Sequence, residues 1–293
     1  MRVSSVRLIS VNDMKIKNCF VPVILYVLLF AGLAVGTFYD YQISQTLTQM
    51  EDSWARFMEI WAEPPSLLFV AFSFAALAVY VLKQKVKGHV YLSVLCLIGG
   101  AISTYSTITR TVEYYSVEVY EMTLTKILSV VGTVVIMAVF MKLASMIKDE
   151  TLKKIKPAFV TVVAVGLATL VIISAIKTVW GRERFRAMED ISHFTRWYIP
   201  VGRAVDDAHK SFPSGHTSNA VIMYTVSFIY DKLGDKKKAG IIKGLAILWV
   251  ALVMFSRMVC GAHFLSDTCA GAIITMTIVI VCRKIFCKDT KSL

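Results

Sequence analysis

A histidine and an aspartate stand four residues apart near the end of the chain, in a segment that begins with Ser256 and Arg257. If this segment is helical, His263 and Asp267 lie on one face, because side chains at positions i and i+4 are neighbours there. A carboxylate that hydrogen-bonds one imidazole nitrogen fixes the tautomer and leaves the other nitrogen free. An oriented imidazole is a nucleophile, so His263 is a candidate for covalent catalysis with Asp267 in support.

A second cluster, Pro213-Ser214-Gly215-His216, comes where an apolar segment begins. Proline lacks a backbone N–H and glycine permits unusual dihedral angles, so the chain can turn tightly here. The turn predicts a helix N-terminus whose free N–H groups bind an anion such as phosphate, with the Ser214 hydroxyl as a further donor. Taken alone, His216 also fits a structural role.

The third cluster consists of basic residues at the end of another apolar segment. Lys177 and Arg184 are separated by seven residues, and a continuous helix would place both on one side. Arg182 lies between them as an additional cation to which the pattern assigns no role. Lys177 and Arg257, each considered alone, are also typical of cationic anchors that extend to the membrane surface.

Together the three clusters supply cations, N–H donors and two histidines. This set suits a dianionic phosphoryl group, whose transition-state charge is spread over three equatorial oxygens. No carboxylate pair and no Cys/His set has the spacing of metal ligands. We therefore expect a reaction that needs no metal and no cofactor.

Apolar segments long enough to cross a bilayer carry these residues. The chain has 293 residues, 56% of them hydrophobic, and a mean hydropathy of +0.64, which excludes an ordinary soluble domain. A helix of about 20 apolar residues spans a hydrocarbon core of roughly 30 Å. The sequence predicts an all-α, polytopic transmembrane helical bundle of about eight spans: 19–39, 65–82, 89–108, 124–147, 158–177, 214–230, 244–258 and 264–282.

The distribution of Lys and Arg orients the predicted bundle. With the N-terminus inside, the cytoplasmic segments hold 20 of the 32 basic residues, as the positive-inside rule requires. Both termini are therefore expected in the cytoplasm and all three clusters at the outer face. The net charge of +12 then reflects these segments, so no nucleic-acid partner is expected. The outer loop 178–213 departs from the bias with six basic residues, which calls for a functional reason.

We expect one integrated domain with two parts. Residues 1–157 supply N-terminal transmembrane helices and interfacial loops, and residues 158–293 form the catalytic transmembrane core with the three clusters. In the loop 40–63, aromatic residues such as Trp54 and Trp61 predict a short helix at the membrane interface. This helix fits either an ordinary aromatic belt or a gate for lipid access.

The three clusters resemble the signature of the type 2 phosphatidic acid phosphatase superfamily, in its membrane-bound lipid phosphatase branch. The signature reads Lys-x6-Arg-Pro, Pro-Ser-Gly-His and Ser-Arg-x5-His-x3-Asp, and this chain matches it except that Phe185 replaces the first Pro. The resemblance covers residues 158–284. It implies a six-helix core with three spans before the first cluster, whereas five precede it here. An extra pair of spans preserves the sidedness.

The resemblance implies a role for each matching residue. His263 attacks phosphorus to give a phosphohistidine while Asp267 holds and polarises it. His216 protonates the leaving oxygen and then activates water. The phosphoryl oxygens are held by Lys177, Arg184, Ser214, Gly215 and Arg257.

The predicted function is a metal-independent membrane phosphatase that hydrolyses a lipid-linked phosphate monoester or a polyprenyl pyrophosphate at the outer membrane face. A lipid phosphotransferase that uses the same histidine is an alternative. A non-catalytic lipid transporter or scramblase is an alternative of another class, against which the intact His216, His263 and Asp267 argue, and the spans disfavour a soluble vanadate haloperoxidase. The expected partners are the substrate and membrane lipids, in a bacterial cytoplasmic membrane. The identity of the lipid and the oligomeric state are left open.

Overall fold

The computed structural model describes residues 4–85, 87–115 and 122–287, and every regular element within these ranges is helical. The α-helices are α1 (Ser4–Leu47), α2 (Ser53–Trp61), α3 (Pro64–Lys83), α4 (His89–Tyr115), α5 (Met122–Ser145), α6 (Asp149–Trp180), α7 (Gly215–Ile222), α8 (Val226–Leu233), α9 (Lys236–Val259) and α10 (Leu265–Phe286). Three short 3-10 helices are η1 (Phe185–Ala187), η2 (Ile191–His193) and η3 (Met223–Thr225).

Seven helical segments of the described residues are long and apolar enough to cross a bilayer. They overlap seven of the predicted spans and confirm an all-α polytopic bundle, so the protein is an integral membrane protein. The one remaining predicted span, 214–230, is also helical but is divided into α7, η3 and α8. Near η3, the hydroxyls of Thr225 and Ser227 bond to carbonyls three residues earlier, at 2.6 and 2.7 Å. Such bonds accompany a tightened turn.

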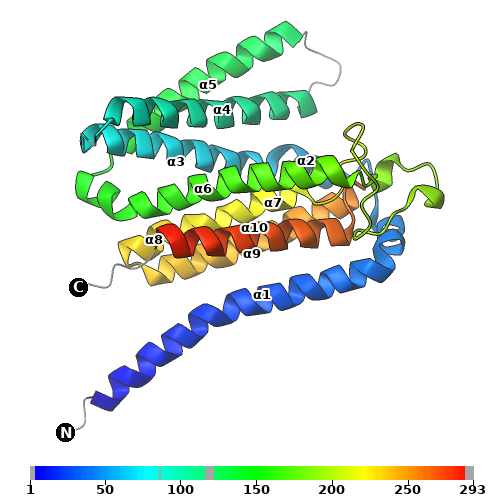
Figure 1. Cartoon of the computed structure of the whole chain (residues 1–293), viewed down its shortest axis with the longest axis horizontal. Helices are drawn as coiled ribbons and strands as arrows, with labels where there is room; N and C mark the ends of the chain where they lie inside the picture. The colour runs from blue at the N-terminus through cyan, green and yellow to red at the C-terminus, as the bar shows by residue number, and fades with distance from the viewer. Residues whose placement is uncertain (1–3, 86, 116–121, 288–293) are drawn as a thin grey trace.

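The helices form an elongated bundle with α4 and α5 on one side and α1 on the other (Figure 1). Between them, α6 packs against α3, α10 and α8, and α1 runs along α10. The core at these contacts contains Val70, Val162, Ile222, Phe228 and Val279. The predicted division at 157/158 falls inside α6, so this one helix joins both parts of the chain.

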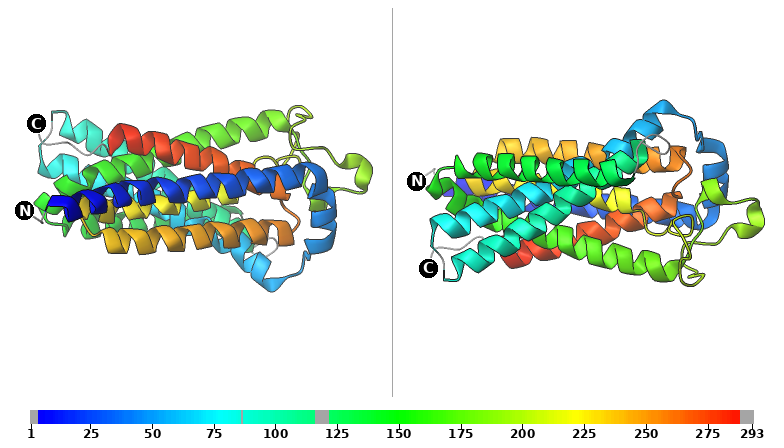
Figure 2. Two further views of the ribbon diagram at one scale, coloured as in Figure 1. Left: turned by 90° about the horizontal axis from the view of Figure 1, so that it is seen from below. Right: turned by 90° about the horizontal axis from the view of Figure 1, so that it is seen from above.

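The short helix α2 and the long loop after α6 lie together at one end of the bundle (Figure 2). Asp52 caps α2 by accepting a hydrogen bond from the Ala55 amide at 2.7 Å. Trp54 and Trp61 are exposed on this helix, as predicted for an interfacial segment. At the opposite end α1 begins and α10 ends (Figure 1), so the first α-helix starts and the last one finishes on the same side, away from the loop.

Candidate active site

Lys177 lies in the last turn of α6, which ends at Trp180. The next residue, Gly181, has φ 63°, and a β-carbon there would come within 2.4 Å of the Gly202 carbonyl oxygen. Only glycine fits this left-handed turn and close approach. The helix therefore does not continue through Lys177 and Arg184, and a shared helix face is not what brings them together. The chain leaves the helix and returns Arg184 to the same site, where its amide donates to Ala208 O at 2.8 Å.

The second cluster forms the predicted helix start. Ser214 is the N-cap of α7, and its Oγ accepts from the amide and the hydroxyl of Thr217 at 3.4 and 3.1 Å. The first amides of a helix have no intrahelical partner and carry the positive end of its dipole. A β-carbon on Gly215 would lie 3.5 Å from Lys177 Cε, so the helix start and the lysine side chain adjoin one another.

His263 lies in the turn between α9 and α10 and is almost fully buried. Its Nδ1 donates a hydrogen bond to the Ser211 carbonyl oxygen at 2.6 Å. This bond fixes the tautomer with the hydrogen on Nδ1 and leaves the lone pair of Nε2 available. Asp267 is its predicted partner at a longer distance: α10 begins only at Leu265, so the two residues do not share a helix face, and Nδ1 is 3.8 Å from Asp267 Oδ2, an ion-pair distance.

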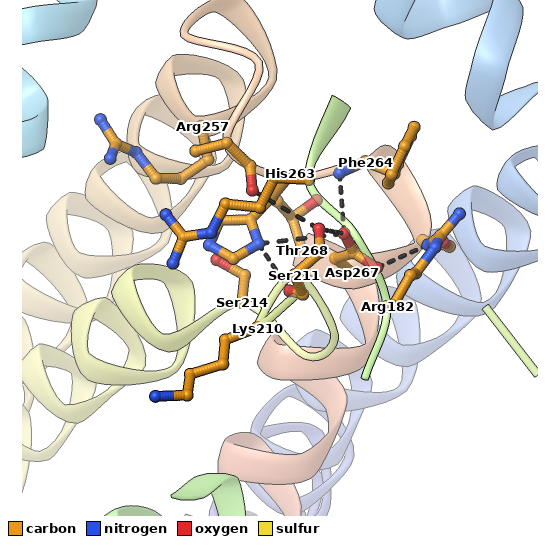
Figure 3. A network of polar contacts seen from close by, with 12 residues as sticks. Arg182, Lys210, Ser211, Ser214, Arg257, His263, Phe264, Asp267 and Thr268 are labelled. Carbon is orange, nitrogen blue, oxygen red and sulfur yellow. Dashed lines mark hydrogen bonds and ion pairs between the residues drawn. The ribbon is translucent and has the colours of Figure 1, made fainter. Parts of the chain in front are cut away.

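Asp267 is buried at the start of α10, and both of its oxygens have partners. Oδ1 pairs with Arg182 Nη1 at 2.6 Å. Oδ2 accepts from the Ser211 hydroxyl at 2.6 Å and from the Phe264 amide at 2.9 Å. Ser211 thus bonds to the histidine through its carbonyl and to the aspartate through its hydroxyl, and connects the two residues (Figure 3).

Arg182, which had no assigned role, lies behind Asp267 on the side away from His263 (Figure 3). Its guanidinium is 1% exposed, pairs with Asp40 Oδ2 at 3.0 Å as well as with Asp267, and lies 4.0 Å from the Phe264 ring centroid. Two carboxylates around one guanidinium offset the cost of burying these charges. Asp40 comes from α1, so the N-terminal helix completes the network around Asp267.

His216 extends from the first turn of α7 towards α2 and α3. Its Nε2 donates to the Glu59 carbonyl oxygen at 3.0 Å, and its Nδ1 is 3.6 Å from Glu63 Oε1. A carbonyl oxygen only accepts, so Nε2 carries a hydrogen. Nδ1 is then the nitrogen with which His216 can exchange a proton with a substrate.

A cavity of about 520 Å³ brings five of the predicted residues together at this end of the bundle: Lys177, Arg184, Gly215, His216 and His263. Arg184 pairs with Asp207 at 3.0 Å, while its buried Nε has no hydrogen-bond partner among the described residues. Such a donor beside His263 is suited to bind an anion.

The other three predicted residues are not part of the cavity lining. Ser214, Arg257 and Asp267 lie behind it and are at most 1% exposed. Arg257 donates to Ala55 O at 3.2 Å and lies 3.5 Å from Glu59. Its guanidinium therefore connects α9 to the short helix α2.

Burial lowers the pKa of His263 well below the ordinary histidine value of 6.5, and Lys177 and Arg184 act in the same direction while Asp267 opposes them. The imidazole is therefore neutral at pH 7. A neutral, oriented imidazole in a cavity with two cations has the properties of a nucleophile for an anionic substrate.

Comparison with known protein families matches residues 157–291 to the PAP2 superfamily. This part of the chain belongs to the PAP2 superfamily. No curated protein and no solved structure matches the chain. Members of the superfamily are phosphatases, and the protein is accordingly a phosphatase.

Several residues of the site lie outside the PAP2 region or outside its signature. The N-terminal part contributes Asp40 behind the site and Glu63 and Arg110 on the cavity wall. Nothing in the local sequence connects these positions to the distant residues of the three clusters, although charged residues at the ends of apolar spans were a signal. In the part of the chain that the structure describes, no three His, Cys, Asp or Glu side chains are grouped to hold a metal ion.

Proposed function

We propose that this PAP2 phosphatase hydrolyses a lipid-linked phosphate monoester or pyrophosphate through a phosphohistidine on His263. The observation that carries the proposal is the hydrogen bond from Nδ1 to the Ser211 carbonyl, which leaves Nε2 as the basic nitrogen in a cavity lined by Lys177 and Arg184. Many proteins bind anions with cationic side chains. Phosphoryl transfer through a histidine also requires an oriented basic imidazole in the same cavity.

In the first step the Nε2 lone pair of His263 forms a bond to phosphorus as the bond from phosphorus to the leaving oxygen breaks. His216 gives its Nδ1 proton to that oxygen. In the second step water attacks the phosphohistidine, His216 takes the proton of the water, and phosphate leaves as the lone pair returns to His263. Asp267 stabilises the positive charge that develops on the imidazole.

Lys177, Arg184 and the Gly215 amide line the cavity and are assigned direct contact with the phosphoryl oxygens. Ser214 and Arg257 lie behind the lining. We assign them indirect roles: Ser214 caps the helix that presents the Gly215 amide, and Arg257 holds α2 through Ala55. This assignment places two of the predicted phosphate ligands one layer further from the substrate.

The position of the cavity supports a lipid substrate. It lies at one end of a membrane bundle, next to an interfacial helix with exposed Trp54 and Trp61. The charge bias of the loops supports an extracytoplasmic site with both termini in the cytoplasm, in a bacterial cytoplasmic membrane. Transfer of the phosphoryl group to a lipid alcohol would share the first step and differ only in the acceptor.

The test is phosphate release from a panel of purified lipid phosphates by the wild type and by His263→Ala, with detergent size exclusion as the check on folding. We expect the variant to lose at least about 1,000-fold in rate, because the covalent step has no other nucleophile. Retention of more than a few per cent of the activity would contradict the proposal. Formation of a phosphorylated alcohol in place of inorganic phosphate, when an alcohol acceptor is added, would favour the phosphotransferase.

A further inference from the structure

Glu63 lies immediately before Pro64 at the start of α3, outside the region matched to the PAP2 superfamily. Its side chain is 9% exposed and forms part of the cavity wall. A carboxylate buried to this extent needs partners of opposite charge or hydrogen-bond donors. The partners that it has point to its role.

Two of these partners come from one face of α7. Glu63 Oε1 lies 3.6 Å from His216 Nδ1 and accepts a hydrogen bond from Asn219 Nδ2 at 2.9 Å. His216 and Asn219 are three residues apart, so both face the same side of the helix. The third partner, Arg110 of α4, lies 3.4 Å from Oε2. Asn219 and Arg110 thus hold the carboxylate next to Nδ1 of the histidine.

Glu63 approaches Nδ1 of His216, the nitrogen that is left for proton transfer to the substrate. Nε2 of His216 is bonded to the Glu59 carbonyl oxygen at 3.0 Å. Proton transfer to a substrate must therefore use Nδ1. A carboxylate a few ångströms from an imidazole favours its protonated form, which is the form that an acid catalyst needs.

The other charged groups near His216 do not replace Glu63. The Glu59 carboxylate is paired with Arg186 at 2.9 Å and lies 3.5 Å from Arg257. Burial and Arg257 on α9 oppose a positive charge on His216. Tyr114 of α4 presents a ring with its centroid 6.3 Å from that of His216. Glu63 is the carboxylate that faces His216 Nδ1 directly.

We propose that Glu63 is a positioning residue for the leaving-group acid: it directs His216 Nδ1 towards the cavity and stabilises its protonated form. The proposal rests on the proposed role of His216. As the bond to the leaving oxygen breaks, the proton passes from Nδ1 to that oxygen, while Glu63 keeps its negative charge. When water later gives a proton to Nδ1, Glu63 stabilises the imidazolium that is restored.

The experiment compares kcat/KM for two substrates in detergent: dioctanoyl phosphatidic acid, whose alkoxide needs a proton to leave, and 4-nitrophenyl phosphate, whose phenolate does not. Because kcat/KM reports the steps up to phosphoryl transfer, slow hydrolysis of the intermediate does not mask the effect. We expect Glu63→Gln to lower the value for phosphatidic acid at least about tenfold more than the value for the aryl ester. A purely structural role would lower both equally.

Glu113→Gln is the matched control. Glu113 lines the same cavity at the end of α4, but none of the ion pairs or hydrogen bonds found for His216 in the described residues involves it. Both kcat/KM values should change by one common factor in this variant. Glu63→Asp keeps the charge and should recover part of the difference between the two substrates.

His216→Ala separates this inference from the proposed function. If His216→Ala discriminates between the substrates and Glu63→Gln does not, the role of Glu63 is wrong while the acid role of His216 stands. If His216→Ala lowers both kcat/KM values equally, His216 is not the acid of the proposed function.

Should Glu63→Gln lose activity on both substrates, Asn219→Ala is the deciding variant, because it removes the amide that holds Glu63 but keeps the charge of Glu63. Equal loss on both substrates in that variant also overturns the inference.

Discussion

The Ser211 carbonyl oxygen and His263 Nδ1 are 2.6 Å apart, and this backbone bond, rather than the nearby carboxylate, fixes the histidine tautomer. The same serine donates its hydroxyl to Asp267 at 2.6 Å. A backbone acceptor cannot be removed by changing a side chain. The orientation of the nucleophile is therefore partly protected from substitution at Asp267.

Asp267→Asn should consequently reduce the rate less than His263→Ala does. Where a carboxylate alone sets the tautomer of a catalytic histidine, loss of its charge costs about 10⁴-fold in kcat. Here we expect a loss of about 10- to 100-fold, because the Ser211 carbonyl still orients the ring and only the electrostatic support is removed. The measurement is the rate of phosphate release at saturating substrate. A rate equal to that of the wild type would remove Asp267 from the mechanism.

Arg182→Met should reduce the free energy of unfolding by about 3–5 kcal/mol, because it leaves Asp40 and Asp267 buried without their common counter-charge. Thermal unfolding in detergent measures the effect, with Arg196→Met in the exposed part of the loop as the control. Addition of Asp40→Asn to Arg182→Met should restore part of the loss. Additive losses in the double variant would contradict a shared network.

His263 should stay neutral as the pH falls through 6.5, because its pKa is lowered by burial. His193 should be charged at that pH, because the hydrogen bond to Glu183 raises its pKa. Nitrogen NMR of the 15N-labelled histidines between pH 5 and 8 distinguishes the two. Since unfolded histidine binds a proton below about 6.5, the buried neutral His263 also makes the protein less stable as the pH falls. Titration of His263 near 6.5 would contradict its buried setting.

Activity should persist in EDTA, because the proposed phosphoryl clamp consists of Lys177, Arg184 and a backbone amide. The measurement is phosphate release before and after dialysis against the chelator, followed by addition of magnesium. A loss that magnesium restores would show that a metal ion takes part and that the cations alone do not complete the site.

The sidedness of the bundle can be tested by cysteine labelling in intact cells. Val205 is 80% exposed in the long loop after α6, and Lys237 is exposed at the start of α9. An impermeant maleimide should label Val205→Cys from outside and Lys237→Cys only after permeabilisation, because the positive-inside rule predicts that the Lys-rich segment 231–243 lies in the cytoplasm. The reverse labelling pattern would show that the topology is inverted and that the substrate lies in the cytoplasmic leaflet.

Much of the bundle could be predicted because a membrane span is a local property. The predicted span 65–82 matches α3 (Pro64–Lys83) to within a residue at each end, since two prolines begin the helix and its hydrophobic stretch decides the rest. The three clusters were predicted to meet at one membrane face. Lys177, Gly215 and His263 do line one cavity.

The features of the site that the sequence did not predict depend on contacts between distant residues. Nothing near Arg182 indicates that its partner is Asp40, 142 positions earlier. Lys177 and Arg184 would share one face only of a continuous helix, but Gly181 ends the helix through a left-handed turn and the loop returns Arg184 to the site. The role of Ser211 also escaped prediction, because its decisive contact is made by a backbone carbonyl that every residue possesses.

The ion pair between Asp40 and Arg182 limits how the two parts of the chain can be exchanged. A chimaera that joins residues 157–291 to the N-terminal helices of another protein would bury Arg182 beside Asp267 with one counter-charge missing. Such a graft should succeed only when the donor helix supplies an acidic side chain at the level of Asp40. Designers of hybrid membrane phosphatases can use this single position as a compatibility filter before any variant is expressed.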